Sequence, residues 1–173
     1  MKLPKPQFFS LQLGTASRYT VTLEHTLRHG FTRPATLVCP KLYVVTQDAN
    51  IHYVGVTNRP MSSRLNLGLK AKGKSGYHGY RWKTLTKLLY LTVWSFPDKN
   101  GKDFLRELET TEAEFAFLVR KNTGQWPLSQ TEIHFYRATT AHLQAVAEMM
   151  AHCMQLPYRA ERGHVGEMQN ARV

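Results

Sequence analysis

Cysteine is scarce in this sequence, and long apolar runs are absent. The 173 residues include only two cysteines, Cys39 and Cys153, which lie far apart and outside any C-x-x-C pair. The sequence therefore indicates neither a disulfide framework nor a zinc site, and a reducing cytoplasm is the expected compartment. Because no run of about 18 apolar residues occurs, we expect no membrane span. Residues 1–6 are basic but contain two prolines and no long apolar stretch, so a signal peptide is not expected either.

Acidic residues are missing from a long central stretch. None occurs in residues 49–97, although the whole chain has 12, and the formal net charge is +11. A field of one sign attracts a polyanion, and nucleic acid is the first candidate. The alternative is a solvated basic surface that binds no polyanion. The basic residues of this stretch are Arg59, Arg64, Lys70, Lys72, Lys74, Arg81, Lys83 and Lys87.

Two short apolar runs around a polar turn predict a β-hairpin at the start of the basic stretch. The runs are residues 42–45 (LYVV) and 53–56 (YVGV), and most residues between them are polar. Asn58 and Pro60 then have the pattern of a helix start, so a helix is expected from residue 60 to about residue 72. A third strand is expected at residues 88–94. Upstream, residues 7–12 and 18–23 alternate enough to be strands, although the second run could equally be a short helix.

The hairpin and helix together resemble the core motif of the GIY-YIG nuclease family. Tyr43 and Tyr53 stand at the family's two tyrosine positions, Gly55 completes the second triplet, and Arg64 is the helix arginine. The resemblance covers residues 41–130. It implies an α/β domain with a small, mostly antiparallel three-stranded sheet flanked by helices, to which this chain adds N- and C-terminal segments.

The resemblance also implies roles for these residues. Tyr43 would orient or deprotonate the attacking water, and Tyr53 would bind the phosphate. Arg64 carries a permanent, forked charge that suits a nonbridging phosphate oxygen. Each tyrosine could instead be a half-buried strand aromatic with a paired hydroxyl.

A metal ligand is expected on the helix that follows the acid-free stretch. Residues 110–114 (TTEAE) before an apolar run resemble the helix that carries the family's metal-binding glutamate, and on that match Glu114 binds Mg²⁺ or Mn²⁺. Glu112 is the second candidate, and helical geometry separates the two carboxylates by about 200°, so they cannot face one site. Alternatively, Glu114 forms a capping box with Thr111 at the start of a helix. Outside the helix, Glu132 is the main acidic competitor; it shares a strand face with His134 in the alternating run expected up to residue 136.

Departures from the family pattern leave the general base open. Gly68 stands where many relatives have His or Tyr, and Val56 stands where some have Lys. Three residues on the following loop could supply a base instead: His78, Tyr80 and Lys83. The same loop interleaves aromatic and basic residues, which suits nucleic acid, although Tyr80 could equally pack in the core. Many relatives have an Asn after the helix, and this chain has Gln130 there, which keeps an amide but is not the usual residue.

These observations predict a metal-dependent endonuclease that hydrolyses phosphodiester bonds in single- or double-stranded DNA, of restriction or phage type. The expected organisation is an N-terminal extension packing on the core (1–40), a nuclease core (41–137), a C-terminal helix (138–157) and a flexible tail (158–173). Cutting two strands with one site would suggest a homodimer or sequential nicking. The alternatives are a non-catalytic nucleic-acid-binding module and an RNA-directed nuclease. The expected substrate-binding residues are Arg59, Lys70, Lys72, Lys74, Arg81 and Gln130.

Overall fold

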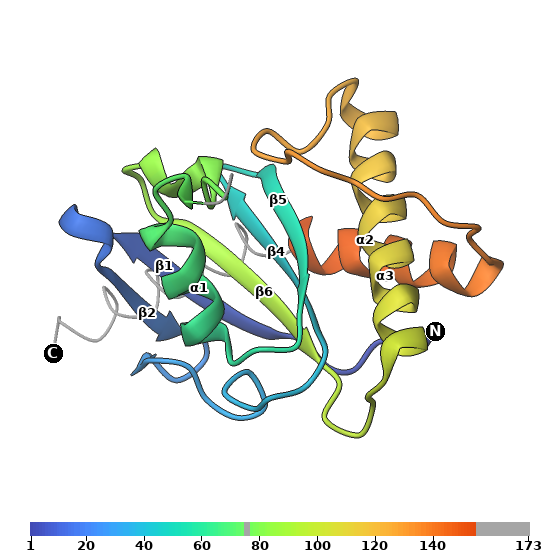
Figure 1. Cartoon of the computed structure of the whole chain (residues 1–173), viewed down its shortest axis with the longest axis horizontal. Coiled ribbons are helices and arrows are strands. Elements are labelled where there is room, and N and C mark those ends of the chain that lie inside the picture. The colour runs from blue at the N-terminus through green and yellow to red at the C-terminus, as the bar shows by residue number, and fades with distance from the viewer. Residues whose placement is uncertain (75–76, 155–173) are drawn as a thin grey trace, which may run out of the picture.

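The computed structural model describes residues 1–74 and 77–154, and the predicted tail lies outside them (Figure 1). Its centre is one antiparallel sheet of six strands in the order β3-β2-β1-β6-β4-β5. The prediction of an α/β protein is confirmed, but a three-stranded sheet is wrong, because residues 1–40 contribute three strands to the same sheet. The strands are β1 (Gln7–Leu13), β2 (Tyr19–Leu23), β3 (Arg28–His29), β4 (Lys41–Gln47), β5 (Asn50–Thr57) and β6 (Leu89–Ser95).

The N-terminal strands join the sheet because β1 has an apolar face that needs a partner. Phe9 and Leu11 are fully buried, and Phe9 pairs with Leu91 of β6. Strand β2 then pairs with β1, with Leu11 opposite Val21. Of the two alternatives for residues 18–23, the strand is confirmed.

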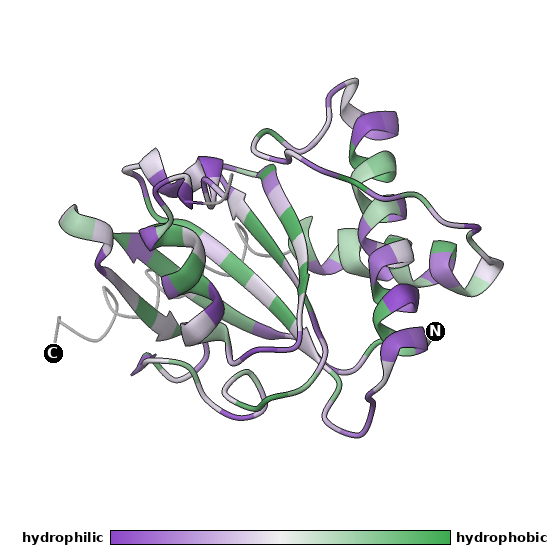
Figure 2. Ribbon diagram, viewed as in Figure 1, coloured by the Kyte–Doolittle hydropathy of each residue, from purple (hydrophilic) through white to green (hydrophobic). Residues whose placement is uncertain are grey.

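Helices cover the two faces of the sheet. Helix α1 packs with the short 3₁₀ turn η3 (Arg81–Thr84) on one face, over a core that includes Tyr43, Leu65 and Trp82. Helices α2 and α3 pack on the other face, over Leu42, Val54 and Trp94. Figure 2 shows hydrophobic residues recurring along the central strands and hydrophilic residues in the connecting loops. The helices are α1 (Met61–Lys70), α2 (Lys102–Thr123) and α3 (Thr140–Met154).

In the described ranges, no helix combines the length and the apolar character that crossing a bilayer requires.

Helix α2 begins eight residues before the predicted start, which removes the predicted cap. Thr110 and Thr111 are buried inside the helix, and their hydroxyls donate to the carbonyl oxygens of Arg106 and Glu107, each at 2.8 Å. The capping box of Thr111 with Glu114 is therefore wrong. The cause is burial. Small hydroxyl residues fit a closely packed helix face when a carbonyl oxygen one turn earlier accepts a hydrogen bond from the hydroxyl.

The strand expected up to residue 136 is also wrong. Between α2 and α3 the chain forms no strand and instead runs along the outer edge of β5. The amides of Leu128 and Ser129 donate to the carbonyl oxygens of Ile51 and His52, at 3.1 and 2.7 Å. This segment satisfies part of an edge that would otherwise be unpaired, and it brings residues 129–134 beside the hairpin.

Lys41 is a buried cation that the sequence did not single out. It is fully buried, and its Nζ donates to the carbonyl oxygens of Leu37, Cys39 and Arg59, at 2.6, 2.8 and 3.1 Å. Burial lowers the pKa of this lysine, and the neighbouring Cys39 opposes that effect. Two of the bonds tie the start of β4 to the loop before it, and the bond to Arg59 ties it to the turn before α1, so Lys41 helps to fix where α1 begins.

Candidate functional site

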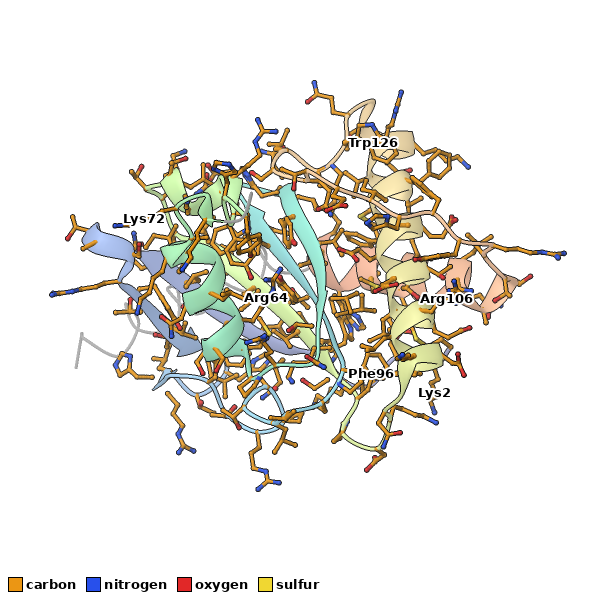
Figure 3. The ribbon with its side chains drawn as sticks, viewed as in Figure 1. Lys2, Arg64, Lys72, Phe96, Arg106 and Trp126 are labelled. Carbon is orange, nitrogen blue, oxygen red and sulfur yellow. The ribbon has the colours of Figure 1, made fainter. Side chains whose placement is uncertain are left out.

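A cavity of about 410 Å³ lies at the edge strand β5, between the helices of the two faces. Strand β5 contributes Tyr53, α1 contributes Arg64, and α2 contributes Glu112. The segment after α2 contributes Gln130 and neighbouring residues. Figure 1 shows α1 and α2 on either side of β5, and Figure 3 shows Arg64 on α1. The hairpin-helix unit and the acidic helix therefore meet at one place.

Arg64 is held by a network of phenols. Its Nε donates to the hydroxyl of Tyr43 and one Nη donates to the hydroxyl of Tyr77, both at 3.1 Å. The hydroxyls of Tyr43 and Tyr80 lie 3.0 Å apart, and the guanidinium lies 5.2 Å from the centroid of the Tyr80 ring. Tyr53 packs edge-on against Tyr80, with ring centroids 5.4 Å apart. The guanidinium is thus fixed in orientation before any ligand binds.

The charge of Arg64 has no carboxylate partner among the described residues. Burial alone would lower the pKa of Arg64, but the surrounding phenols favour its charged form and raise the pKa overall. A partly buried, permanently charged fork without a counter-ion is suited to an anionic ligand such as a phosphate.

Tyr43 does not occupy the position that the resemblance implies for a water-activating residue. Its side chain is fully buried and does not line the cavity. Burial and the adjacent Tyr80 raise the pKa of Tyr43 well above that of a free phenol. A buried, protonated phenol that accepts a hydrogen bond from Arg64 positions the arginine; it cannot reach a water in the cavity. Tyr53 and Tyr80 do line the cavity, and burial raises the pKa of both.

Gly68 explains how Tyr80 reaches this site. A Cβ atom at position 68 would overlap the ring of Tyr80, so the aromatic ring fills the space beside α1 that a side chain at position 68 would take. The ring also stacks on Trp82, with centroids 4.4 Å apart. The phenol of Tyr80 thus lies beside Arg64. Gly55 has a similar reason, since a Cβ there would lie 2.6 Å from the rings of Tyr43 and Tyr53.

We predict that Gly68→Ala destabilises the fold by about 1–3 kcal/mol, because the added methyl overpacks the ring of Tyr80. Urea unfolding would measure the loss. Gly14→Ala is the matched control, since a Cβ there would meet its nearest neighbour at an ordinary 3.7 Å. In the double variant Gly68→Ala/Tyr80→Ala the two losses should be less than additive. Additive losses would show that the two positions do not share this space.

Glu112, and not Glu114, reaches the cavity. Glu112 lines it together with Glu109, one turn earlier on α2, whereas Glu114 does not line it. The prediction that Glu114 is the acid of this site therefore disagrees with the geometry. The reason is the phase of the helix: α2 buries Thr111 and Phe115 toward the sheet and α3, and this rotation turns Glu112 toward Tyr53.

The environment of Glu112 raises its pKa to about 8. Burial is the main cause and the nearby Glu109 adds to it, whereas Arg64 and Gln130 oppose it. A carboxyl group that is costly to ionise in the free protein gains most from a cation beside it. In the described part of the chain, no three His, Cys, Asp or Glu side chains gather in a metal-binding arrangement.

Two of the loop residues proposed as a base do not line the cavity. Lys83 donates from its Nζ to the carbonyl oxygens of Ala71 and His78, at 2.9 and 2.8 Å, so it closes a loop. His78 is exposed and packs near Gly73 instead. The cavity does contain an imidazole on its far wall: His134 Nε2 lies 3.0 Å from a carboxylate oxygen of Glu132.

The predicted substrate-binding residues divide into two groups. Arg81 and Gln130 line the cavity itself. The Gln130 amide is also structural: its Oε1 accepts from the Val54 amide at 3.1 Å, and its Nε2 donates to the Glu132 carbonyl at 3.2 Å. The second group lies over α1, outside the cavity, and consists of Arg59, Lys70, Lys72 and Lys74.

Comparison with protein-family models, curated proteins and solved structures gives no match to this chain.

Proposed function

We propose that this protein is a metal-dependent endonuclease that hydrolyses phosphodiester bonds in DNA. The observation that carries the proposal is the pairing, in one cavity, of an arginine that forms no ion pair with any described residue and a carboxyl group whose burial makes it costly to ionise. Such a pair fits a ligand that places a negative charge on the arginine and a positive charge on the carboxylate. A phosphodiester with a divalent metal ion has both. The resemblance to GIY-YIG nucleases and the basic, acid-free stretch support the same function.

Glu112 fits a hard divalent ion, so we assign it, in place of Glu114, as the residue that would hold Mg²⁺ or Mn²⁺. Its oxygen ligand is of the type that Mg²⁺ prefers, and one carboxylate with several retained waters is usual for this ion. When bound, the ion would neutralise charge on the phosphate and lower the pKa of a coordinated water.

The protein's own residues then have separate roles. Arg64 binds a nonbridging phosphate oxygen, and Tyr43 and Tyr77 hold its guanidinium in place. Because their pKa values are raised, Tyr53 and Tyr80 remain protonated, so they donate hydrogen bonds and are not bases. The proton of the attacking water passes to His134, which the Glu132 carboxylate orients.

Incubation of plasmid and single-stranded DNA with the parent protein and Mg²⁺ or Mn²⁺ tests the proposal. We expect nicked or linear products that EDTA abolishes. His134→Gln should slow cleavage, because the amide fills a similar space in the cavity wall but cannot accept a proton. Absence of cleavage of every DNA substrate would contradict the nuclease. Faster cleavage of RNA at the same salt concentration would instead favour the RNA-directed alternative.

A further inference from the structure

A second hollow lies outside the motif, between the β1–β2 turn and the C-terminal end of α1. It has a volume of about 760 Å³, and its lining includes Arg18, Asn66 and Lys70. The turn belongs to residues 1–40, which the resemblance does not cover. It is therefore a feature of this chain and not of the core motif.

The turn that carries Arg18 is held in place against α1. Ala16 and Ser17 have positive φ angles of 55° and 59°, so the backbone makes a tight reversal. The hydroxyl of Ser17 donates to the carbonyl oxygen of Leu69 at 3.1 Å. The hydroxyl of Tyr19 donates to the backbone carbonyl oxygen of Ser62 at 3.3 Å. The backbone at Arg18 is thus fixed by the hydrogen bonds of Ser17 and Tyr19, while its side chain is exposed. Less conformational entropy of the turn is therefore lost when a ligand binds.

Shared residues connect this hollow to the cavity of the candidate site. Lys70 lines the hollow and also a neighbouring one that contains Arg59 and Lys74. Tyr77 lines that neighbouring hollow and the site cavity, and its hydroxyl accepts from Arg64. Figure 3 shows Lys72 just beyond the end of α1, along the same route. A path of hollows therefore runs from Arg18 over α1 to Arg64.

Within residues 1–74 and 77–154, the path is basic and contains no acid. None of these residues that line its hollows outside the site cavity is Asp or Glu. The sequence accounts for this, because residues 1–23 and 49–97 contain no acidic residue. The cavity at its end does contain acids, on α2 and on the segment after it. The charge thus changes from purely cationic along the path to mixed at the site.

We propose that this path, from Arg18 across Lys70 to Tyr77, binds the phosphate backbone of duplex DNA that flanks the scissile bond. The inference rests on the proposed function of the cavity. The lining of the path offers Arg, Lys, Ser, Thr and Asn side chains, which suit phosphates. Its two aromatic residues, Tyr19 and Tyr77, are engaged through their hydroxyls with Ser62 and Arg64, whereas binding of single strands relies on a series of aromatic faces free to stack on bases. The N-terminal strands thus supply the duplex contact that a separate DNA-binding domain would otherwise supply.

Salt-dependent binding tests this without requiring cleavage. Fluorescence anisotropy of a labelled DNA duplex, measured in EDTA over a range of salt concentrations, gives the slope of log Kobs against log[salt]. For Arg18→Gln/Lys70→Gln the slope should become shallower by about 2, because about 0.9 counterions are released per phosphate contact. Lys102→Gln/Lys121→Gln removes the same charge from exposed positions on α2 and should leave the slope at the parental value.

The outcomes separate this inference from the nuclease. If the parent cleaves DNA with Mg²⁺ but both double variants have the parental slope, the path is wrong and the nuclease stands. If the parent never cleaves but only Arg18→Gln/Lys70→Gln weakens duplex binding, the path stands as a DNA-binding surface. Equal loss in the two double variants would show only the effect of net charge and would overturn the assignment of the path. Tighter binding of single-stranded DNA or of duplex RNA at the same salt would overturn duplex DNA as the ligand.

Discussion

Glu112→Gln is expected to abolish metal-dependent cleavage of DNA, whereas Glu114→Gln should cleave at close to the parental rate. The amide at position 112 would keep the size of the side chain but lose the negative charge that a hard cation requires. Glu114 does not line the cavity, so its amide variant changes the charge of α2 by the same amount at a matched position two residues away. Plasmid cleavage at saturating Mg²⁺ is the measurement. Loss of activity in Glu114→Gln alone would support the prediction from the sequence and contradict the geometry.

The same substitution has a readout that does not depend on activity. The pKa of Glu112 is about 8 in the folded protein, against an ordinary value of 4.5. The folded state therefore holds this proton more tightly than the unfolded state does. As a result, Glu112 lowers the free energy of unfolding progressively as the pH rises from about 4.5 through about 8. In Glu112→Gln, this part of the decline in the free energy of unfolding with pH should be absent.

Metal binding should act in the opposite direction, because it favours the ionised carboxylate. Mg²⁺ or Mn²⁺ should thus raise the melting temperature of the parent more at pH 8 than at pH 6. Glu112→Gln should show no such difference, and Glu114→Gln should behave as the parent does. An equal response of all three proteins would mean that the ion does not bind at Glu112.

The sequence predicted the hairpin and α1 well because their signals are local. The short apolar runs at residues 42–45 and 53–56 and the Pro at the helix start depend only on neighbouring residues, and β4, β5 and α1 lie close to the predicted bounds. The size of the sheet was missed because it depends on which edge residues 7–13 select. Nothing near those residues indicates that their partner will be β6, which lies far along the chain at residues 89–95.

The positions of the candidate site residues depend on packing at a distance, which local sequence signals do not show. The choice between Glu112 and Glu114 is a choice of helix rotation, which the burial of Thr111 against the sheet and α3 decides. The approach of Tyr80 to Arg64 depends on empty space at Gly68, twelve residues earlier. A glycine in a helix interior is itself a signal, because it costs stability unless something fills the space. Lys41 had no such signal, since its carbonyl partners come from the loop before β4 and from the distant turn before α1.

Arg64→Lys is expected to lower kcat by about 10²–10³, the usual cost of removing one oriented donor from a transition state. The positive charge stays, so electrostatic attraction of DNA changes little and KM should move less than kcat. What is lost is geometry: Arg64 donates to Tyr43 through Nε and to Tyr77 through Nη, and its planar fork fixes the remaining N–H groups toward the cavity. A lysine ammonium has no such plane, and its position is not determined by two phenols at once.

Arg28→Lys is the matched control, because Arg28 is an exposed arginine on β3 that lines neither the cavity nor the path. It should retain the parental kcat. Arg64→Lys should also melt at a temperature close to that of the parent, since the Tyr43 hydroxyl keeps its hydrogen bond to Tyr80. If Arg64→Lys cleaved as fast as Arg28→Lys, the oriented guanidinium would not be part of the mechanism, and the charge alone would account for phosphate binding. A fall in kcat confined to Arg64→Lys would show that catalysis depends on the orientation that the surrounding phenols give to the guanidinium.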